Sequence, residues 1–597
     1  MICARAALAL LLSVAAGVTG MGASKPSVKP KKTPMTPEQR AARSIMKSMS
    51  LRDRVAQLIV GTCFGDAPAK KSPEYQKYKH WVHDLHIGGF IVANRIDHGA
   101  VRNAEPHAMA LFLNQMQKMS KTPLLIAADF ERGASMRVTG GAQFPYNMAY
   151  GAGRDLDAVR YEGLATAREA RAIGVHWIFA PVADVNNNPD NPVINTRSFG
   201  ENADDVAKDV AAYIDGAHSD PKNRVLVTAK HFPGHGDTDT DSHIALAQVT
   251  ANRERLEAVE FAPFRAAIAH GVDSIMTAHL SIPAIEPEEI PATVSSKVLT
   301  GVLREEMKFK NIIVTDAMDM QGLAKMFNPG EAAVRALDAG ADVLLMPLNP
   351  EAVIRAVVSA IEGGRLKQAR IDESVMRVLE AKVHVGITKK KLVDLDDISD
   401  AFDSEEDVAQ AQQASDRAVT LVRNEHDVLP LAGGAQSCLI VMVERRTSTA
   451  GTRMIDAYRK FAPKSQIVVL DASMNPAALA AVVGDTATKC SAIVVAAFST
   501  VAAYRGTVGL GGELTPFVAK LTEGSVPVVV VAMGNPYLLT AFPKTAAYLA
   551  TFSTTPPSEM SAVKALFGEI PIGGHMPVTI PGFSKYGDGI QMPARSR

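Results

Sequence analysis

The segment from Lys230 to His243 concentrates side chains that can carry out acid–base chemistry. Its fourteen residues include one lysine, three histidines and three aspartates, together with two glycines and a proline. The segment directly follows the apolar run 225–227, which is typical of a buried strand that delivers functional side chains into a loop. Asp241 lies two residues from His243, and a carboxylate at that spacing can accept the imidazole N–H, fix its tautomer and raise its basicity. A solvated loop would explain any one of these residues, but the whole string favours a proton-transfer site.

Asp316 is a second candidate, because it ends the apolar run Asn311–Thr315. A carboxylate at the end of a buried strand is fixed in position yet open to substrate, which suits a nucleophile. The alternative is a helix N-cap, since aspartate is favoured at that position and a helix must follow. Taken alone, the residue fits a cap better.

Between residues 50 and 350, short apolar runs alternate with longer amphipathic segments. Eight candidate strands, each followed by a helix candidate, predict a (β/α)8 barrel of the TIM type; a doubly wound open sheet is the alternative. The count of eight and the polar residues just after the strands favour the barrel. The predicted strands are Leu58–Gly61, Gly89–Val92, Leu124–Ala128, Trp177–Val182, Val225–Ala229, Ser274–Ala278, Asn311–Thr315 and Asp342–Met346, and the clearest helices are Asp155–Ala172, Ala203–Ala217, Leu256–Ala269 and Pro350–Glu362.

A barrel gathers its functional groups at the carboxyl ends of the strands, where the loops converge. We therefore expect polar residues that are far apart in sequence to meet around one pocket, although rims also use such residues to close loops. The candidates at these positions are Asp129, Asp184, Arg197, Lys230, His231, His279 and Asp316.

The string Lys-His-Phe-Pro-Gly-His-Gly, followed by Asp-Ser-His, closely resembles the motif of glycoside hydrolase family 3, in the branch of β-N-acetylglucosaminidases. The resemblance implies that His243 is the general acid/base and that Asp241 orients and polarises it. It also implies that Lys230 and His231 hydrogen-bond the sugar in the first subsite, and that this region has the barrel fold.

The segment Asn311–Met320 resembles the nucleophile motif of the same family, in which a strand ends in Ser/Thr-Asp before a methionine-bearing loop. The resemblance assigns the nucleophile to Asp316. Asp319 is then interpreted as a cap or a surface acid.

Two further segments resemble sugar-binding parts of the family. Arg197 corresponds to an arginine that contacts the substrate, and a guanidinium supplies several fixed donors for hydroxyl-rich ligands. Asp129 corresponds to an acid that binds sugar hydroxyls. Relatives commonly carry Asp-x-Glu-Gly-Gly at that place, so Arg132 departs from the pattern. The role of Asp184 stays open.

These residues imply retaining hydrolysis of a terminal β-linked N-acetylglucosamine, in cell-wall (peptidoglycan) fragments or chitooligosaccharides. Asp316 would form a covalent glycosyl-enzyme, and His243 would protonate the leaving oxygen and later deprotonate water; the usual arrangement uses two carboxylic acids. We expect no metal and no organic cofactor, since the histidines and aspartates lack a metal-site spacing.

Three alternatives stay open. A phosphorylase would use phosphate in place of water, and a neutral imidazole would not repel that anion. A glucosidase or xylosidase of the family would take its acid/base carboxylate from the second domain, where Glu513 is the most loop-like candidate but equally a helix start. A non-catalytic carbohydrate-binding protein would need none of Asp316, Asp241 and His243.

Composition limits the possible partners. The formal net charge is zero and aromatic residues make up 6% of the chain, so neither a basic patch nor a stacking platform recommends nucleic acid as a partner. Cys63, Cys438 and Cys490 are widely spaced, so we interpret them as buried small hydrophobes rather than a disulfide framework. The oligomeric state cannot be predicted from these features.

The N-terminus has the outline of a secretory signal, with Arg5, an apolar core and small residues after it. We predict a signal peptide over residues 1–23, a flexible leader over 24–37, and export to the periplasm or the exterior. The apolar stretch is too short to span a bilayer comfortably, so no stable membrane insertion is expected.

A chain of 597 residues is too long for one ordinary core. We predict the catalytic barrel over residues 38–395 and a solvated, charge-rich linker over 396–412. Residues 413–597 are predicted to form a smaller α/β sandwich, because apolar runs alternate there with helical stretches.

Overall fold

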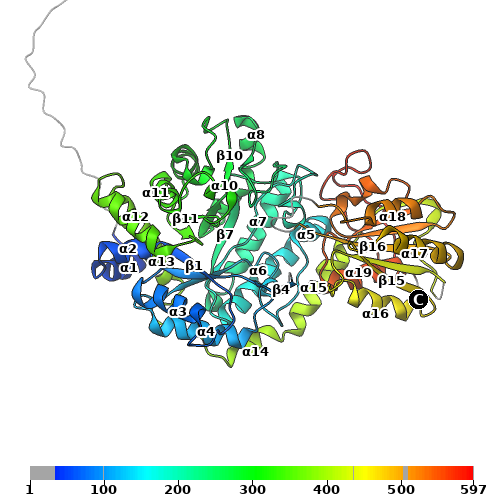
Figure 1. The fold of residues 1–597 in the computed structure, drawn as a ribbon, viewed down its shortest axis with the longest axis horizontal. Helices are drawn as coiled ribbons and strands as arrows, with labels where there is room; N and C mark the ends of the chain where they lie inside the picture. The colour runs from blue at the N-terminus through cyan, green and yellow to red at the C-terminus, as the bar shows by residue number, and fades with distance from the viewer. Residues whose placement is uncertain (1–33, 98–99, 434–435, 502–507, 596–597) are drawn as a thin grey trace, which may run out of the picture.

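The computed structural model describes residues 34–97, 100–433, 436–501 and 508–595. A barrel and a smaller sheet domain lie side by side, with the helices α5 (Asn147–Gly153) and α15 (Glu405–Ala418) near their boundary (Figure 1). The predicted signal peptide and residues 24–33 of the predicted leader lie outside the described residues.

The first domain is an eight-stranded parallel barrel, which confirms the predicted fold. Its strands follow the order β11-β9-β7-β6-β5-β2-β1-β12, and a parallel bridge between Val314 and Val343 joins the two ends. The strands are buried because both the barrel interior and the surrounding helices exclude water from them. They are β1 (Ile59–Cys63), β2 (Gly89–Val92), β5 (Leu125–Ala128), β6 (Trp177–Ile178), β7 (Leu226–Phe232), β9 (Ser274–Thr277), β11 (Ile312–Thr315) and β12 (Leu344–Leu345).

Helices surround the barrel, and most match the predicted segments. The predicted helix Leu256–Ala269 was wrong as a single element: it is divided, because Pro263 cannot continue a helix and starts the next one. Among the described residues, no helix combines the length and the apolar character needed to cross a bilayer. The helices of this region are α1 (Pro37–Lys47), α2 (Leu51–Ala56), α3 (Pro73–Lys79), α4 (Pro106–Met119), α5, α6 (Leu156–Ala172), α7 (Ala203–His218), α8 (Arg253–Ala258), α9 (Ala262–Ala269), α10 (Gln321–Ala324), α11 (Pro329–Ala339), α12 (Pro350–Glu362) and α13 (Gln368–His384).

The second domain is a six-stranded sheet with helices on both faces, as predicted. Its order is β13-β18-β17-β16-β14-β15, and all neighbours are parallel except β13 and β18. Two apolar clusters, one on each face of the sheet, form its core. The elements are β13 (Thr420–Asn424), β14 (Cys438–Val443), α16 (Thr452–Phe461), β15 (Gln466–Asp471), α17 (Pro476–Lys489), β16 (Ile493–Ser499), α18 (Leu514–Leu521), β17 (Val528–Gly534), β18 (Ala547–Ala550) and α19 (Pro556–Leu566).

The segment predicted as a solvated linker is helical and packed. It forms α14 (Asp397–Phe402) and the first turns of α15, which contacts α5 of the barrel and α19 of the second domain. Asp407 is buried and accepts hydrogen bonds from Tyr161, at 2.7 Å, and from Arg168. Asp407 therefore pairs with the barrel, whereas the other acidic residues of this segment face water. The precise domain limits remain predictions.

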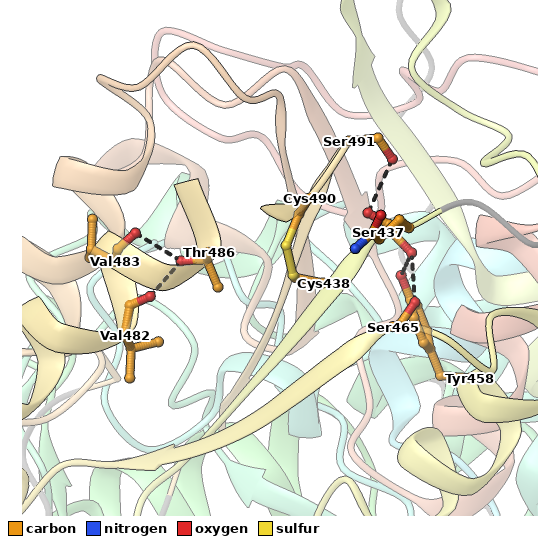
Figure 2. The surroundings of a disulfide bond; sticks show 10 residues. Ser437, Cys438, Tyr458, Ser465, Val482, Val483, Thr486, Cys490 and Ser491 are labelled. Carbon is orange, nitrogen blue, oxygen red and sulfur yellow. Dashed lines mark hydrogen bonds between the residues drawn. A yellow bond between two sulfur atoms is a disulfide. The ribbon is translucent and has the colours of Figure 1, made fainter. Parts of the chain in front are cut away.

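Cys438 and Cys490 form a disulfide, so the interpretation of these two cysteines as unpaired was wrong (Figure 2). Cys438 begins β14 and Cys490 lies just before β16, and these neighbouring parallel strands enter the sheet at the same edge. This pairing brings the two Cα atoms to 5.7 Å, within the range that a disulfide spans. The two cysteines are 52 residues apart in sequence, and this spacing does not predict the disulfide. Cys63 is a buried free thiol, as expected.

Candidate active site

A buried cluster of charges lies at the carboxyl ends of β5, β6 and β7. The Lys230 ammonium is 2.8 Å from Asp129 Oδ1 and 2.7 Å from Glu131 Oε1. Only 2% of Lys230 is exposed, and burial lowers its pKa, but the two carboxylates outweigh burial and raise the pKa above its ordinary value. Lys230 and His231 lie inside β7 rather than after it, because the strand runs on to Phe232.

Arg197 completes this charge cluster from the loop after β6. Its Nε and Nη2 donate to the two oxygens of Glu131 at 2.9 and 2.7 Å, a paired geometry that fixes the plane of the guanidinium. Burial raises the pKa of Glu131, but Arg197 and Lys230 outweigh it and hold the pKa well below its usual range. We refer to Asp129, Glu131, Arg197 and Lys230 as the charge cluster.

Asp129 is held from two sides. Lys230 donates to Oδ1, and Arg137 donates to Oδ2 at 2.8 Å. Burial raises the pKa of Asp129, but Lys230 and Arg137 outweigh it and lower the pKa to about 2. The carboxylate therefore stays ionised and can accept hydrogen bonds through both oxygens.

Asp184, whose role the sequence left open, orients His231. Its carboxylate is buried and lies 2.7 Å from His231 Nδ1, while the backbone N–H groups of His231 and His235 also donate to it. With Nδ1 bound in this way, His231 directs Nε2 toward Arg197 Nη2, at 3.3 Å. Asp184 therefore connects the loop after β6 to β7.

Asp241 and His243 interact as predicted. Asp241 Oδ1 lies 2.8 Å from His243 Nδ1 and also accepts the backbone N–H of His243 at 2.9 Å. Asp241 is buried, whereas 24% of the His243 side chain is exposed. A carboxylate that occupies Nδ1 leaves Nε2 as the nitrogen that can exchange a proton with a ligand.

Asp316 lies directly after β11, and its Oδ1 accepts the backbone N–H of Ala317 at 2.7 Å. Burial raises its pKa, but the nearby imidazoles of His231, His279 and His243 outweigh burial and keep the pKa below its ordinary value. An ionised carboxylate near an oriented imidazole can supply a nucleophile and a proton donor. By contrast, burial raises the pKa of Asp319.

His279 is a structural neighbour of Asp316. Its Nε2 lies 3.0 Å from the carbonyl oxygen of Ala317, and its Nδ1 lies 2.8 Å from Thr293 Oγ1. Burial lowers the pKa of His279, although the nearby Asp316 carboxylate opposes this shift. The ring thus supports the loop that carries Asp316.

Three residues of the site were missed by the sequence analysis. Glu131 belongs to the charge cluster, Arg137 pairs with Asp129 of that cluster, and buried His235 contacts Ser242 Oγ at 2.9 Å, next to His243. The two acids Asp129 and Glu131, two residues apart after a strand, were a signal for Glu131. No local signal marks Arg137.

Two further expectations concern Glu513 and metal binding. Glu513 is exposed at the start of α18, in agreement with the helix-start alternative. Across the described residues, no group of three or more His, Cys, Asp or Glu side chains is arranged to hold a metal ion.

A model of the glycosyl hydrolase family 3 N-terminal domain matches residues 50–381. The chain belongs to glycoside hydrolase family 3. The resemblance predicted from the motif is therefore confirmed. This family 3 protein is also similar to a solved family 3 β-N-acetylglucosaminidase from Paenibacillus sp. str. FPU-7, with 30% identity and a TM-score of 0.77 over 89% of this chain and 99% of that chain.

Two curated relatives extend the comparison. The family 3 chain is 27% identical to a β-N-acetylglucosaminidase/β-glucosidase of Cellulomonas fimi over 530 residues, which are 85% of this chain and 90% of the relative. It is 33% identical to β-hexosaminidase A of Pseudoalteromonas piscicida over 370 residues, which are 58% of this chain and 60% of the relative. The first match spans both domains.

Proposed function

We propose that this family 3 glycoside hydrolase releases terminal β-linked N-acetylglucosamine with retention of configuration. The names of the Paenibacillus, Cellulomonas and Pseudoalteromonas relatives support an N-acetylhexosamine substrate. The observation that carries the proposal is the pair of Asp241 and His243, 2.8 Å apart, near the ionised Asp316.

In the proposed reaction, Asp316 attacks the anomeric carbon and the bond to the leaving oxygen breaks. His243 gives its proton to that oxygen. In the second step, His243 takes a proton from water, whose oxygen attacks the anomeric carbon and releases Asp316. Asp241 keeps the imidazole in one tautomer and stabilises its positive charge.

The charge cluster is proposed to bind the sugar. Asp129 offers acceptor oxygens to hydroxyl groups, while Lys230 and Arg197 supply donors, and His231 hydrogen-bonds the sugar beside them. Because these groups are already paired with each other, they keep their positions before the substrate arrives.

The test is the ratio of kcat/KM for para-nitrophenyl N-acetylglucosaminide and the corresponding glucoside. A site that hydrogen-bonds the acetamido group loses those bonds with glucose, so we expect a preference of about a hundredfold or more for the acetamido sugar. A ratio near unity, or one that favours glucose, would contradict the proposal and support the glucosidase alternative.

We further propose that the protein is exported by its N-terminal signal and acts on peptidoglycan fragments or chitooligosaccharides. Sequencing the N-terminus of the protein recovered from the periplasm or the medium would test export. An intact Arg5 region on cell-associated protein would contradict it. Chromatography of digests of muropeptides and of chitobiose would distinguish the two sources of substrate.

A phosphorylase is the second candidate, and the imidazole at the acid/base position is the observation that favours it. A neutral imidazole does not repel phosphate, whereas a carboxylate would. Analysis of the products formed in phosphate-free and in phosphate-rich buffer distinguishes the hydrolase from the phosphorylase. Free N-acetylglucosamine in both buffers supports the hydrolase, and a sugar phosphate in the second supports the phosphorylase.

A further inference from the structure

The two domains are joined by buried hydrogen bonds beside the charge cluster. Asn186 Nδ2 of the barrel donates to Tyr537 Oη of the second domain at 3.0 Å. Asn195 Nδ2 approaches Asn535 Oδ1 of the second domain at 3.4 Å. All four residues are buried, so water does not compete for these contacts.

The two asparagines of the barrel are also bonded to each other. Asn186 Oδ1 accepts the backbone N–H of Asn195 at 2.9 Å, and Asn195 Oδ1 accepts that of Thr196 at 2.8 Å. Asn195 has a φ of 41°, in the left-handed region that non-glycine residues seldom adopt. Its conformation therefore depends on the side-chain partners around it.

Arg197 follows two residues later, in the same 3₁₀ turn, Asn195–Arg197. A shift of this turn would move the guanidinium away from Glu131 and His231. Its backbone is held on the barrel side by Asn147, whose Nδ2 donates to the Arg197 carbonyl at 2.7 Å. The barrel also contributes the carbonyls of Val193 and Ile194, which accept from Arg197 Nη1 at 3.0 Å and from its backbone N–H at 2.8 Å. A further support comes from the second domain, through Asn186 and Asn195.

The contact surface on the second domain is preorganised. Asn535 follows β17 directly, where its N–H donates to the Ser499 carbonyl at 2.8 Å and its Nδ2 to the Val508 carbonyl at 2.9 Å. Its Oδ1 accepts the N–H of Tyr537 at 3.0 Å. The sheet of the second domain thus fixes the positions of Asn535 and Tyr537, the two residues that contact the barrel.

We infer that Asn535 and Tyr537 are positioning residues for Arg197. The second domain places the guanidinium that binds the sugar, although it contributes no group to the charge cluster. This inference rests on the proposed role of Arg197 in binding the acetamido sugar.

The interface offers a matched control. Tyr586 also crosses between the domains, where its hydroxyl contacts Asp205 on α7. Tyr537→Phe and Tyr586→Phe therefore remove the same hydroxyl group from the same interface, but only the first lies on the path to Arg197.

The experiment measures kcat and KM for para-nitrophenyl N-acetylglucosaminide in the full-length protein. We expect Tyr537→Phe and Asn535→Ala to lower kcat/KM by about ten- to a hundredfold, mainly through KM, since small displacements of binding groups have effects of that order. Tyr586→Phe should remain within about twofold of the wild type. Melting temperatures of all variants establish whether they are folded. If Asn535→Ala is not folded, the kcat/KM of Tyr537→Phe alone tests the inference.

A double variant separates positioning from a general loss of stability. If Tyr537 acts through Arg197, Tyr537→Phe should have little further effect on kcat/KM in an Arg197→Lys background. The inference would be overturned if the losses in kcat/KM from Tyr537→Phe and Arg197→Lys multiplied in the double variant. It would also be overturned if Tyr537→Phe kept the kcat/KM of Tyr586→Phe. Either result would leave the proposed function intact. If Arg197→Lys itself behaves like the wild type, the role of Arg197 in the proposed function fails, and the inference fails with it.

Discussion

The two halves of the candidate active site hold their charges differently. In the charge cluster, Lys230 and Arg197 share the buried carboxylate of Glu131 in direct ion pairs. In the other half, Asp316 accepts a backbone N–H, and the partly exposed His243 lies 2.8 Å from the carboxylate of Asp241. One half consists of ion pairs with lysine and arginine, whereas the other combines carboxylates with an imidazole, which can gain or lose a proton near neutral pH.

The difference fits the role that we propose for each half. A binding group must keep its geometry without substrate, which mutual ion pairs achieve at a cost in desolvation. A nucleophile and a proton donor must change charge during each turnover, and a tight ion pair would oppose that change. If these residues act as proposed, the groups that bind the sugar are distinct from the groups that react.

Asp316→Asn should produce the largest effect. The amide is nearly the same size, so the fold should persist, but the anionic attack is lost and turnover should fall by several powers of ten. Single-turnover and steady-state assays measure this effect. Asp319→Asn is the control and should retain most activity; the reverse pattern would transfer the nucleophile to Asp319.

Lys230→Met should affect both binding and stability. Removal of the ammonium leaves the buried Glu131 and the partly buried Asp129 each with a partner missing, and breaking a buried pair in this way typically costs about 3–5 kcal/mol in the free energy of unfolding. Lys208→Met removes a lysine that is 61% exposed from its pair with Asp205, and should cost less than about 1 kcal/mol. Urea unfolding of both variants provides the comparison, and equal costs would show that the cluster is not a fixed set of pairs.

His243→Ala should discriminate between leaving groups. Activated aryl glycosides depart without a proton, so their kcat/KM should fall far less than that of an oligosaccharide, by a difference of about 10²–10⁴-fold. Asp241→Ala should act in the same direction more weakly, because it disorders the imidazole without removing it. Equal losses on both substrates would mean that His243 binds or packs and does not transfer a proton.

The pH dependence of stability should distinguish an acid whose pKa is raised from an acid whose pKa is lowered. Burial, followed by Asp205, raises the pKa of Asp209 from 3.8 to about 8, so the folded state binds a proton that the unfolded state releases. Stability should therefore fall as pH rises from about 4 to 8, and Asp209→Asn should reduce that slope. Asp129 has its pKa lowered from 3.8 to about 2, so its contribution is complete above pH 3.8 and is lost only as the pH falls toward 2.

Urea midpoints at pH 5 and pH 8 test this contrast. Asp209→Asn should gain stability relative to wild type at the higher pH, whereas Asp129→Asn should differ from wild type by the same amount at both values. Parallel curves for wild type and Asp209→Asn would contradict the prediction.

Features that depend on neighbouring residues could be predicted from the sequence. The eight barrel strands were located closely, because each is a short apolar run followed by polar residues. The contact between Asp241 and His243 was also predicted, since two residues of chain are enough to bring the groups together. The family motif assigned candidate roles to these residues and to Asp316, and those roles are now predictions for experiment.

Contacts across long sequence separations were decided only by the tertiary structure. Glu131 meets Arg197, and Cys438 meets Cys490, because strand order places their loops side by side. The acidic segment before the second domain has the composition of a solvated linker, yet Asp407 is buried because Arg168 and Tyr161 of the barrel are its partners. Local sequence specifies which segments become strands, helices and loops, but the partner of a buried charge or thiol depends on which distant segment the fold brings to it.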